Sequence, residues 1–263
     1  MLVKLLFIGD IIGRPGRRAV ASLLPGLKAE HGFDLVIANG ENSAGGFGIT
    51  PKIAEELFGL GIDVLTSGNH IWDQKEIEVY LREDNRLLRP ANYPVDDLGR
   101  GSLVFTLDQR PQIKIGVLNL AGRVFVGPAD CPFRVGLESV EKLKSETDIV
   151  VVDFHAETTS EKNALALYLD GQVSLFVGTH THVQTADERI LPGGTAYITD
   201  VGMVGGRNSV IGMNADRVIK KFLDGKPQRY EVEKSEPWFS AVVAEIDESN
   251  GTALSIRRLH IPA

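Results

Sequence analysis

Short apolar runs recur along the first third of the chain, and each is followed by a turn and an amphipathic segment. The runs have the composition of buried strands, at residues 2–8, 35–38 and 64–66. The amphipathic segments carry apolar side chains at helical spacing, at residues 15–31, 51–60 and 73–82. Pro15 opens the first of them and Gly32 ends it, as is typical of a helix. This alternation predicts a parallel or mixed sheet with helices packed on it.

The second half of the chain is richer in strand-like sequence. We expect strands at residues 102–107, 113–119, 149–153, 173–177, 195–199, 241–246 and 253–260, and one helix at residues 160–169. Two segments, 123–134 and 204–213, contain glycine or proline without a clear period, and we expect surface loops there. Two sheets packed together with outer helices would account for this order. Because we find no linker, we expect one domain over residues 1–263.

Polar side chains follow five of the predicted strands, at the point where each strand ends. They are Asp10, then Glu41 with Asn42, then Asn69 with His70, then His155, and finally His180 with His182. The carboxyl ends of neighbouring parallel strands lie at one edge of a sheet, where ligands bind in α/β proteins. If these strands are neighbours, the side chains converge on one site.

The chemistry of this set points to metal ions. Carboxylate, amide and imidazole donors without a thiolate suit Mn, Fe or Zn better than Mg or Ca. A carboxylate such as Glu41 can bridge two ions, and two ions about 3.5–4 Å apart clamp a phosphoryl oxygen and activate a bridging water as the nucleophile. His70 lies beside Asn69, so we expect it at the rim, where it could protonate a leaving oxygen.

Each of these residues also has an ordinary interpretation when it is taken alone. An Asp after a strand, such as Asp10, often caps a helix or forms a turn. A single His155 is more often a core histidine than a ligand. The joint occurrence at successive strand ends favours a site instead. Phe47 and Phe125 could stack a nucleobase or simply anchor loops, and Asp153 could orient His155 if its strand is regular.

The combined motifs resemble a known superfamily. They are Gly9-Asp10, Gly40-Glu41-Asn42, Gly68-Asn69-His70, a later histidine after a strand, and Gly178-Thr179-His180-Thr181-His182. This set resembles the calcineurin-like metallophosphoesterases. Two departures, Ile12 in place of a histidine and Glu41 in place of a bridging aspartate, look like the YmdB-like branch of that superfamily.

The resemblance implies a fold, a ligand set and an activity. The fold would be a four-layer α/β/β/α sandwich of two mixed sheets. One metal would be held by Asp10, Glu41, Asn42 and His182, and the other by Glu41, Asn69, His155 and His180. His70 would be the general acid. Members of the branch are described as phosphodiesterases that act on cyclic nucleotides, notably 2′,3′-cyclic AMP, with iron or manganese.

Composition and charge narrow the partners. The 263-residue chain is 43% hydrophobic and 24% charged, with a net charge of -7, so it lacks the basic footprint of a protein that binds long nucleic acid. Cys131 is the sole cysteine, so no disulfide forms within the chain. The apolar N-terminal run is too short for a signal peptide, and no stretch is long enough to span a membrane. We expect a cytoplasmic homo-oligomer that binds a small cyclic nucleotide.

Two other functions are compatible with the same residues. A phosphomonoesterase or a nuclease for short RNA could use the same metal pair. A regulatory protein could bind a nucleotide through the metals and turn it over slowly. The sequence leaves these alternatives open.

Overall fold

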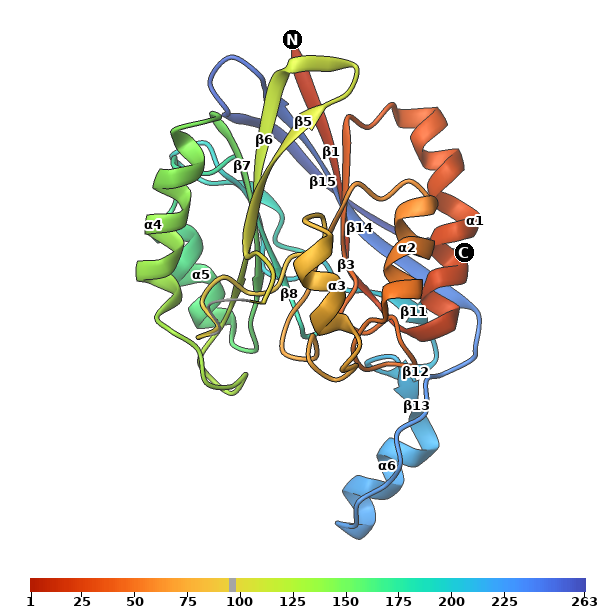
Figure 1. Cartoon of the computed structure of the whole chain (residues 1–263). Helices are drawn as coiled ribbons and strands as arrows, with labels where there is room; N and C mark the ends of the chain where they lie inside the picture. The colour runs from red at the N-terminus through yellow and green to blue at the C-terminus, as the bar shows by residue number, and fades with distance from the viewer. Residues whose placement is uncertain (95–97) are drawn as a thin grey trace.

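Two β-sheets lie face to face, and helices cover their outer faces (Figure 1). The protein is described by a computed structural model that covers residues 1–94 and 98–263. The first sheet has seven strands: β1 (Leu2–Ile8), β2 (Asp10–Ile11), β3 (Leu35–Asn39), β4 (Val64–Thr66), β11 (Met203–Gly206), β14 (Pro237–Asp247) and β15 (Ala253–Pro262). β1, β3 and β4 are parallel, and β14 pairs antiparallel with β1, β11 and β15.

The second sheet has six strands in the order β5-β6-β7-β8-β10-β9. They are β5 (Ser102–Leu107), β6 (Arg110–Ala121), β7 (Ile149–His155), β8 (Leu175–Thr179), β9 (Arg189–Ile190) and β10 (Ala196–Ile198). β6, β7, β8 and β10 are parallel, and the two outer strands are antiparallel to their neighbours. Both sheets are thus mixed, as predicted.

Three apolar clusters separate the four layers. Between the sheets, Phe7 and Ile37 of the first sheet pack with Val151 and Val177 of the second. On the outer face of the first sheet lie α1 (Gly13–His31), α2 (Pro51–Gly59) and α3 (Ile77–Glu83). On the outer face of the second lie α4 (Pro132–Lys144) and α5 (Thr159–Tyr168). This is the α/β/β/α sandwich that the sequence predicts, and the fold class is confirmed.

Local signals explain where the helices begin and end. Gly32 takes a left-handed conformation (φ 62°) after α1, and its N–H is donated to the Lys28 carbonyl. The Thr50 hydroxyl accepts the N–H of Ile53 at 3.3 Å, and Pro51 follows as the first residue of α2.

Several segments differ from the predictions. α3 begins at Ile77 rather than residue 73, because residues 70–73 form a turn in which Asp73 donates its N–H to the His70 carbonyl. The predicted loop 123–134 runs into α4, which the sequence analysis missed. The predicted loop 204–213 contains most of β11 and β12 (Ser209–Val210), and β13 (Met213–Asn214) ends just beyond it.

A further helix, α6 (Ala215–Asp224), was also missed. It extends away from the sandwich below the ends of the sheets (Figure 1). Ile219, Phe222 and Leu223 are exposed on it, whereas Val218 is buried. No helix in the described part of the chain is long and apolar enough to cross a membrane.

Candidate metal centre

One ring nitrogen of His155 is the meeting point of side chains from both sheets. Nε2 of His155 lies 3.0 Å from Oε1 of Glu41 and 3.1 Å from Oδ1 of Asn69. It also lies 3.0 Å from Nδ1 of His180. Ligand atoms of Glu41, His155 and His180 all lie within 4.8 Å of one another. The structure therefore brings together the four residues predicted for one metal.

The other predicted residues lie beside this cluster. Nε2 of His182 lies 3.7 Å from Oδ1 of Asp10. The Asn42 amide nitrogen is 3.1 Å from Oε1 of Glu41 and 3.3 Å from Nε2 of His182. Because the nitrogen of Asn42 faces the site, its amide would have to turn over before the oxygen could bind a cation. All seven predicted ligand residues thus converge, with Glu41 between the two groups.

The two histidines after β8 lie on strained backbone. His180 and His182 have φ angles of 98° and 66°, which are uncommon for residues other than glycine. Asp200 holds the turn between them, because its carboxylate accepts both the N–H and the hydroxyl of Thr181. The ammonium group of Lys162 in turn lies 2.7 Å from that carboxylate.

A buried network holds the ring of His155. The Thr179 hydroxyl lies 2.9 Å from Nδ1 of His155 and donates to Oδ1 of Asp153 at 2.8 Å. The Asn39 amide donates to Oδ2 of Asp153 at 3.1 Å. Asp153 therefore acts on His155 through Thr179. Neither Asn39 nor Thr179 was predicted to hold His155, although each lies within two residues of a predicted ligand.

The other two histidines are also oriented by partners outside the cluster. Nε2 of His180 lies 3.0 Å from Oε2 of Glu157. Nδ1 of His182 lies 2.9 Å from the Ile211 carbonyl, which leaves Nε2 of the ring facing Asp10. Such contacts fix the ring orientation and the tautomer of metal-binding histidines. Glu157 and Ile211 carry no signal in the sequence that would have assigned them this role.

Burial and neighbouring charges strongly shift the pKa values of the acid–base groups in the cluster. Burial by itself would raise the pKa of Glu41, but His155 and the His70 N–H lower it to about 2. Burial would lower the pKa of His155, but the Glu41 and Asp10 carboxylates raise it to about 9. Burial raises the pKa of Asp10 to about 6, although His182 and His155 oppose the change. Buried negative charge here is thus balanced by positive charge on His155.

These residues fit a metal cation. Nε2 of His155 can donate one hydrogen at most, yet three potential ligand atoms surround it at about hydrogen-bond distance. Among the residues that the structure describes, Oδ1 of Asp10 is buried and has no hydrogen-bond partner. Buried polar atoms are rarely left in this state, and oxygen and imidazole donors suit Mn, Fe or Zn.

His70 lies at the edge of the cluster. Its backbone N–H is donated to Oε2 of Glu41 at 3.1 Å, and its ring Nδ1 lies 2.8 Å from Oδ2 of Asp73. Phe47 contacts the ring edge-on, with the ring centroids 5.0 Å apart. The imidazole is therefore fixed from two sides and stays partly exposed.

A cavity of about 400 Å³ opens over the cluster, and His70, His180 and His182 line it. Its other wall is apolar and comes from Phe47, Val210, Ile211, Met213, Val218, Phe222 and Tyr230. Phe125, the other aromatic candidate of the sequence analysis, is 87% exposed and is absent from this lining. Of the two, only Phe47 is at the cavity.

Ile12 stands where related motifs have a histidine, and it has a structural role. Its side chain is fully buried. A Cβ added at Gly212 would lie 2.8 Å from Cγ2 of Ile12, and one at Gly205 would lie 3.1 Å from its Cβ. Ile12 therefore fills the space that these two glycines leave.

The fold and this cluster define an α/β/β/α sandwich protein with a histidine–carboxylate centre at the strand ends of its two sheets. The family model described as YmdB-like protein matches residues 6–259. The chain belongs to the YmdB-like family, and the resemblance found in the sequence is confirmed.

Relatives and solved structures of known sequence match this chain over nearly its whole length. The chain is 44% identical over 259 residues to a 2′,3′-cyclic-nucleotide 2′-phosphodiesterase of Bacillus subtilis strain 168, covering 98% of this chain and 97% of the relative. It is 40% identical to a putative phosphatase/phosphodiesterase of Mycoplasma pneumoniae, covering 98% and 93% of the two chains. A crystal structure of a novel phosphatase from Mycoplasma pneumoniae superposes with a TM-score of 0.93 at 39% identity, covering 100% and 94%. A hypothetical protein from Thermus thermophilus gives a TM-score of 0.89 at 39% identity, covering 99% of each chain.

Proposed function

We propose that this protein is a metal-dependent phosphodiesterase that hydrolyses 2′,3′-cyclic nucleotides, with 2′,3′-cyclic AMP as its model substrate. The observation that carries the proposal is the meeting of Glu41, Asn69 and His180 at one ring nitrogen of His155. The Bacillus relative, whose name states this activity, covers nearly the whole chain.

Two ions would complete the site. Glu41, Asn69, His155 and His180 would hold one, and Asp10, Asn42 and His182 would hold the other with Glu41 shared between them. Iron or manganese suits these donors. When bound, such ions neutralise the charge on the phosphate and make water a stronger nucleophile near neutral pH. Burial and the charge on His155 lower the pKa of His180 to about 3, so its ring is in the neutral form that a metal requires.

Residues beside the cluster would supply the proton that the leaving oxygen requires. As the oxygen of water attacks the phosphorus, the bond to O2′ breaks and the departing oxygen takes a proton from His70. The attacking water releases one proton to solvent, and His70 regains its proton from solvent after the step. Oδ2 of Asp73 holds Nδ1 of that ring at 2.8 Å, which leaves Nε2 to face the reaction. The same contact fixes the orientation of the ring for proton transfer. The product would carry its phosphate on the 3′ oxygen.

The apolar wall of the cavity suits a nucleobase. A volume of about 400 Å³ falls within the range of small-molecule sites, about 300–1,000 Å³. Phe222 lines this wall although 80% of its surface is exposed, so a base bound there would cover it. Phe47 and Tyr230, with ring centroids 6.2 Å apart, offer further aromatic contact.

Glu41→Gln tests the metal-dependent reaction. Removing the shared negative charge should reduce bound metal and lower turnover of 2′,3′-cyclic AMP by at least about 100-fold, because the carboxylate serves both proposed ions. Elemental analysis and chromatography of the nucleotide product measure the two effects. Glu55→Gln, on the exposed side of α2, is the matched control and should change neither. Wild-type turnover without bound metal would contradict the proposal.

His70→Asn separates catalysis from nucleotide binding. We expect kcat to fall about 10²–10⁴-fold, the usual contribution of a general acid, while metal content stays unchanged. A protein that only senses nucleotides would lose little of its function in this variant. Unchanged kcat would mean that another group protonates the leaving oxygen.

A further inference from the structure

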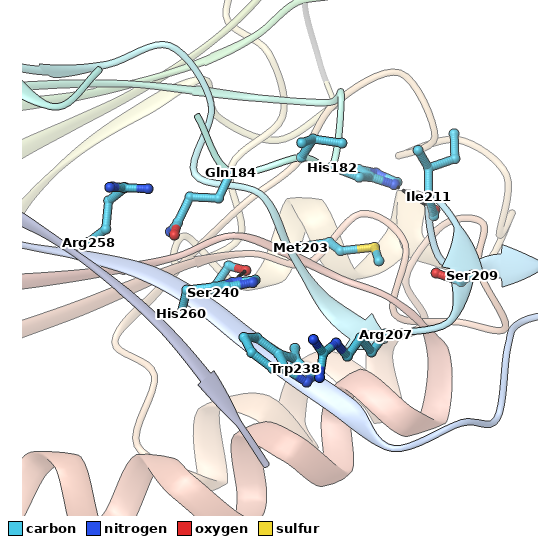
Figure 2. A pocket seen from close by; sticks show the side chains of 12 residues that line it. His182, Gln184, Met203, Arg207, Ser209, Ile211, Trp238, Ser240, Arg258 and His260 are labelled. Carbon is cyan, nitrogen blue, oxygen red and sulfur yellow. Dashed lines mark hydrogen bonds between the residues drawn. The ribbon is translucent and has the colours of Figure 1, made fainter. Parts of the chain in front are cut away.

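A second cavity lies next to the metal centre, and cationic rather than acidic side chains line it. Its volume is about 300 Å³, and residues of strands β11, β14 and β15 make up half of its lining (Figure 2). Arg207, Trp238, Arg258 and His260 give it a basic and aromatic lining. None of these residues belongs to the metal cluster, and the proposed hydrolysis does not use them.

Arg207 presents a cation that is not neutralised nearby. Its guanidinium carbon lies 4.3 Å from the centroid of the Trp238 ring. Trp238 in turn packs on His260, with centroids 4.4 Å apart. Among the residues that the structure describes, no carboxylate lies within 4.0 Å of the Arg207 nitrogens. The Trp238 ring holds the guanidinium in place, and the N–H groups of the guanidinium remain able to bind an anion.

The rest of the lining favours an anion as well. Arg258 is also cationic, although Glu188 pairs with it at 2.7 Å. Nδ1 of His260 is held by the Ser240 hydroxyl at 3.0 Å. Burial, Arg207 and Arg258 together lower the pKa of His260, and all three side chains line this cavity. No Asp or Glu is among the described residues that line this cavity.

The two cavities share a wall. His182 and Ile211 line both of them, and Nδ1 of His182 lies 2.9 Å from the Ile211 carbonyl. In Figure 2 these two side chains lie at one end of the basic cavity, with Ser209 beneath Ile211. A ligand with its phosphate at the metal centre could therefore extend past His182 toward Arg207.

We propose that this second cavity binds a 5′-phosphate group of the nucleotide substrate, with Arg207 as the main ligand. The preferred substrates would then be 2′,3′-cyclic nucleotides that also carry a phosphate on the 5′ oxygen. This inference rests on the proposed function, which places the cyclic phosphate at the metal cluster.

Each part of such a nucleotide has a matching region in the structure. The cyclic phosphate belongs with the metal ligands, and the base belongs with the apolar wall around Phe222. The 5′ side of the ribose is the remaining polar end, and it requires a binding region of its own. The basic cavity beyond His182 provides that region, because its cationic groups can bind phosphate through charge-assisted hydrogen bonds.

The test compares 2′,3′-cyclic AMP with its 5′-phosphorylated form on the metal-loaded full chain. The wild type should show a KM about 10-fold lower for the 5′-phosphorylated substrate, as one charge-assisted contact would provide. Arg207→Gln should remove most of this difference and leave the kinetics of plain 2′,3′-cyclic AMP unchanged. Arg257→Gln is the matched control, since it removes the same charge from an exposed neighbouring position on β15 that does not line the cavity.

Calorimetry gives a second measurement that needs no turnover. Adenosine 3′,5′-bisphosphate should bind the wild type about 10-fold more tightly than adenosine 3′-phosphate, and Arg207→Gln should abolish the difference. Equal binding of the two ligands, or a preference that survives Arg207→Gln, would overturn the inference. If neither cyclic nucleotide were hydrolysed, the proposed function would fail, and the calorimetry would still decide whether Arg207 binds a 5′-phosphate.

Discussion

At the scale of single residues, the centre depends on how closely backbone and ring approach each other. The ring of His155 lies directly against Gly68, whose missing side chain makes room for it. A Cβ added at Gly68 would lie only 2.1 Å from Cδ2 of His155, a distance that side chains do not tolerate. Because three potential ligand atoms meet at the same ring, any displacement of His155 changes the whole cluster.

Gly68→Ala should therefore damage the site out of proportion to its size. We expect a loss of stability of about 1–3 kcal/mol, the usual cost of overpacking, and at least a 10-fold weaker affinity for metal. Thermal unfolding and metal titration measure these changes. Gly59→Ala in α2 is the control, since nothing lies within 4 Å of a Cβ added there. Equal behaviour of the two variants would argue against the close contact.

At the scale of elements, α5 supports the histidine turn that follows β8. Lys162 of α5 is fully buried and pairs with Asp200, which is also fully buried. The same carboxylate accepts the N–H and the hydroxyl of Thr181, between His180 and His182. The left-handed backbone of these two histidines is thus held by a hydrogen-bonded ion pair rather than by glycine.

Lys162→Met should leave the Asp200 carboxylate buried without its cation. Breaking a buried pair in this way costs about 3–5 kcal/mol, so we expect a clear fall in the unfolding temperature. Lys52→Met, on the exposed side of α2, should change stability by no more than about 0.5 kcal/mol. Adding Asp200→Asn to Lys162→Met should recover part of the loss, because the unpaired charge is then removed. Additive losses in the double variant would show that the pair is not coupled.

At the scale of the whole molecule, the centre lies across the junction of the two sheets. Asp10, Glu41 and Asn69 lie at or after strands of the first sheet, whereas His155 ends β7 and His180 follows β8 of the second. Bound ions would therefore link the two halves of the sandwich. They would also replace the positive charge that His155 provides at its raised pKa of about 9.

Metal should consequently stabilise the complete fold. At a free metal concentration of about 1,000 times Kd, binding adds about 4 kcal/mol to the free energy of unfolding. For a chain of this size that corresponds to a rise in unfolding temperature of the order of 10 °C. Calorimetry on chelator-treated protein, before and after Mn²⁺ is restored, measures the rise. Glu41→Gln should show a much smaller one, and an equal rise in this variant would place the stabilising ion elsewhere.

Most of the strands and the layer order could be predicted because they depend on local patterns. Apolar runs such as 149–153 and the strand-end positions of Asp10 and His155 are visible in the sequence alone. The helix α4 was missed because the Gly- and Pro-bearing segment before it hides the start at Pro132. The start of α3 was placed too early, because Asp73 turns toward His70 instead of joining the helix.

The sequence by itself determined the kinds of donors at the centre and their place at strand ends, since the apolar periodicity that builds the strands also marks where they stop. Only the tertiary structure decided which atoms meet. Thr179 connects Asp153 to His155, α6 supplies Phe222 to the cavity, and Arg207 lies on Trp238 because β11 pairs with β14. The physical reason is that these contacts depend on how strands and helices pack in three dimensions, which no local pattern of polar and apolar residues contains.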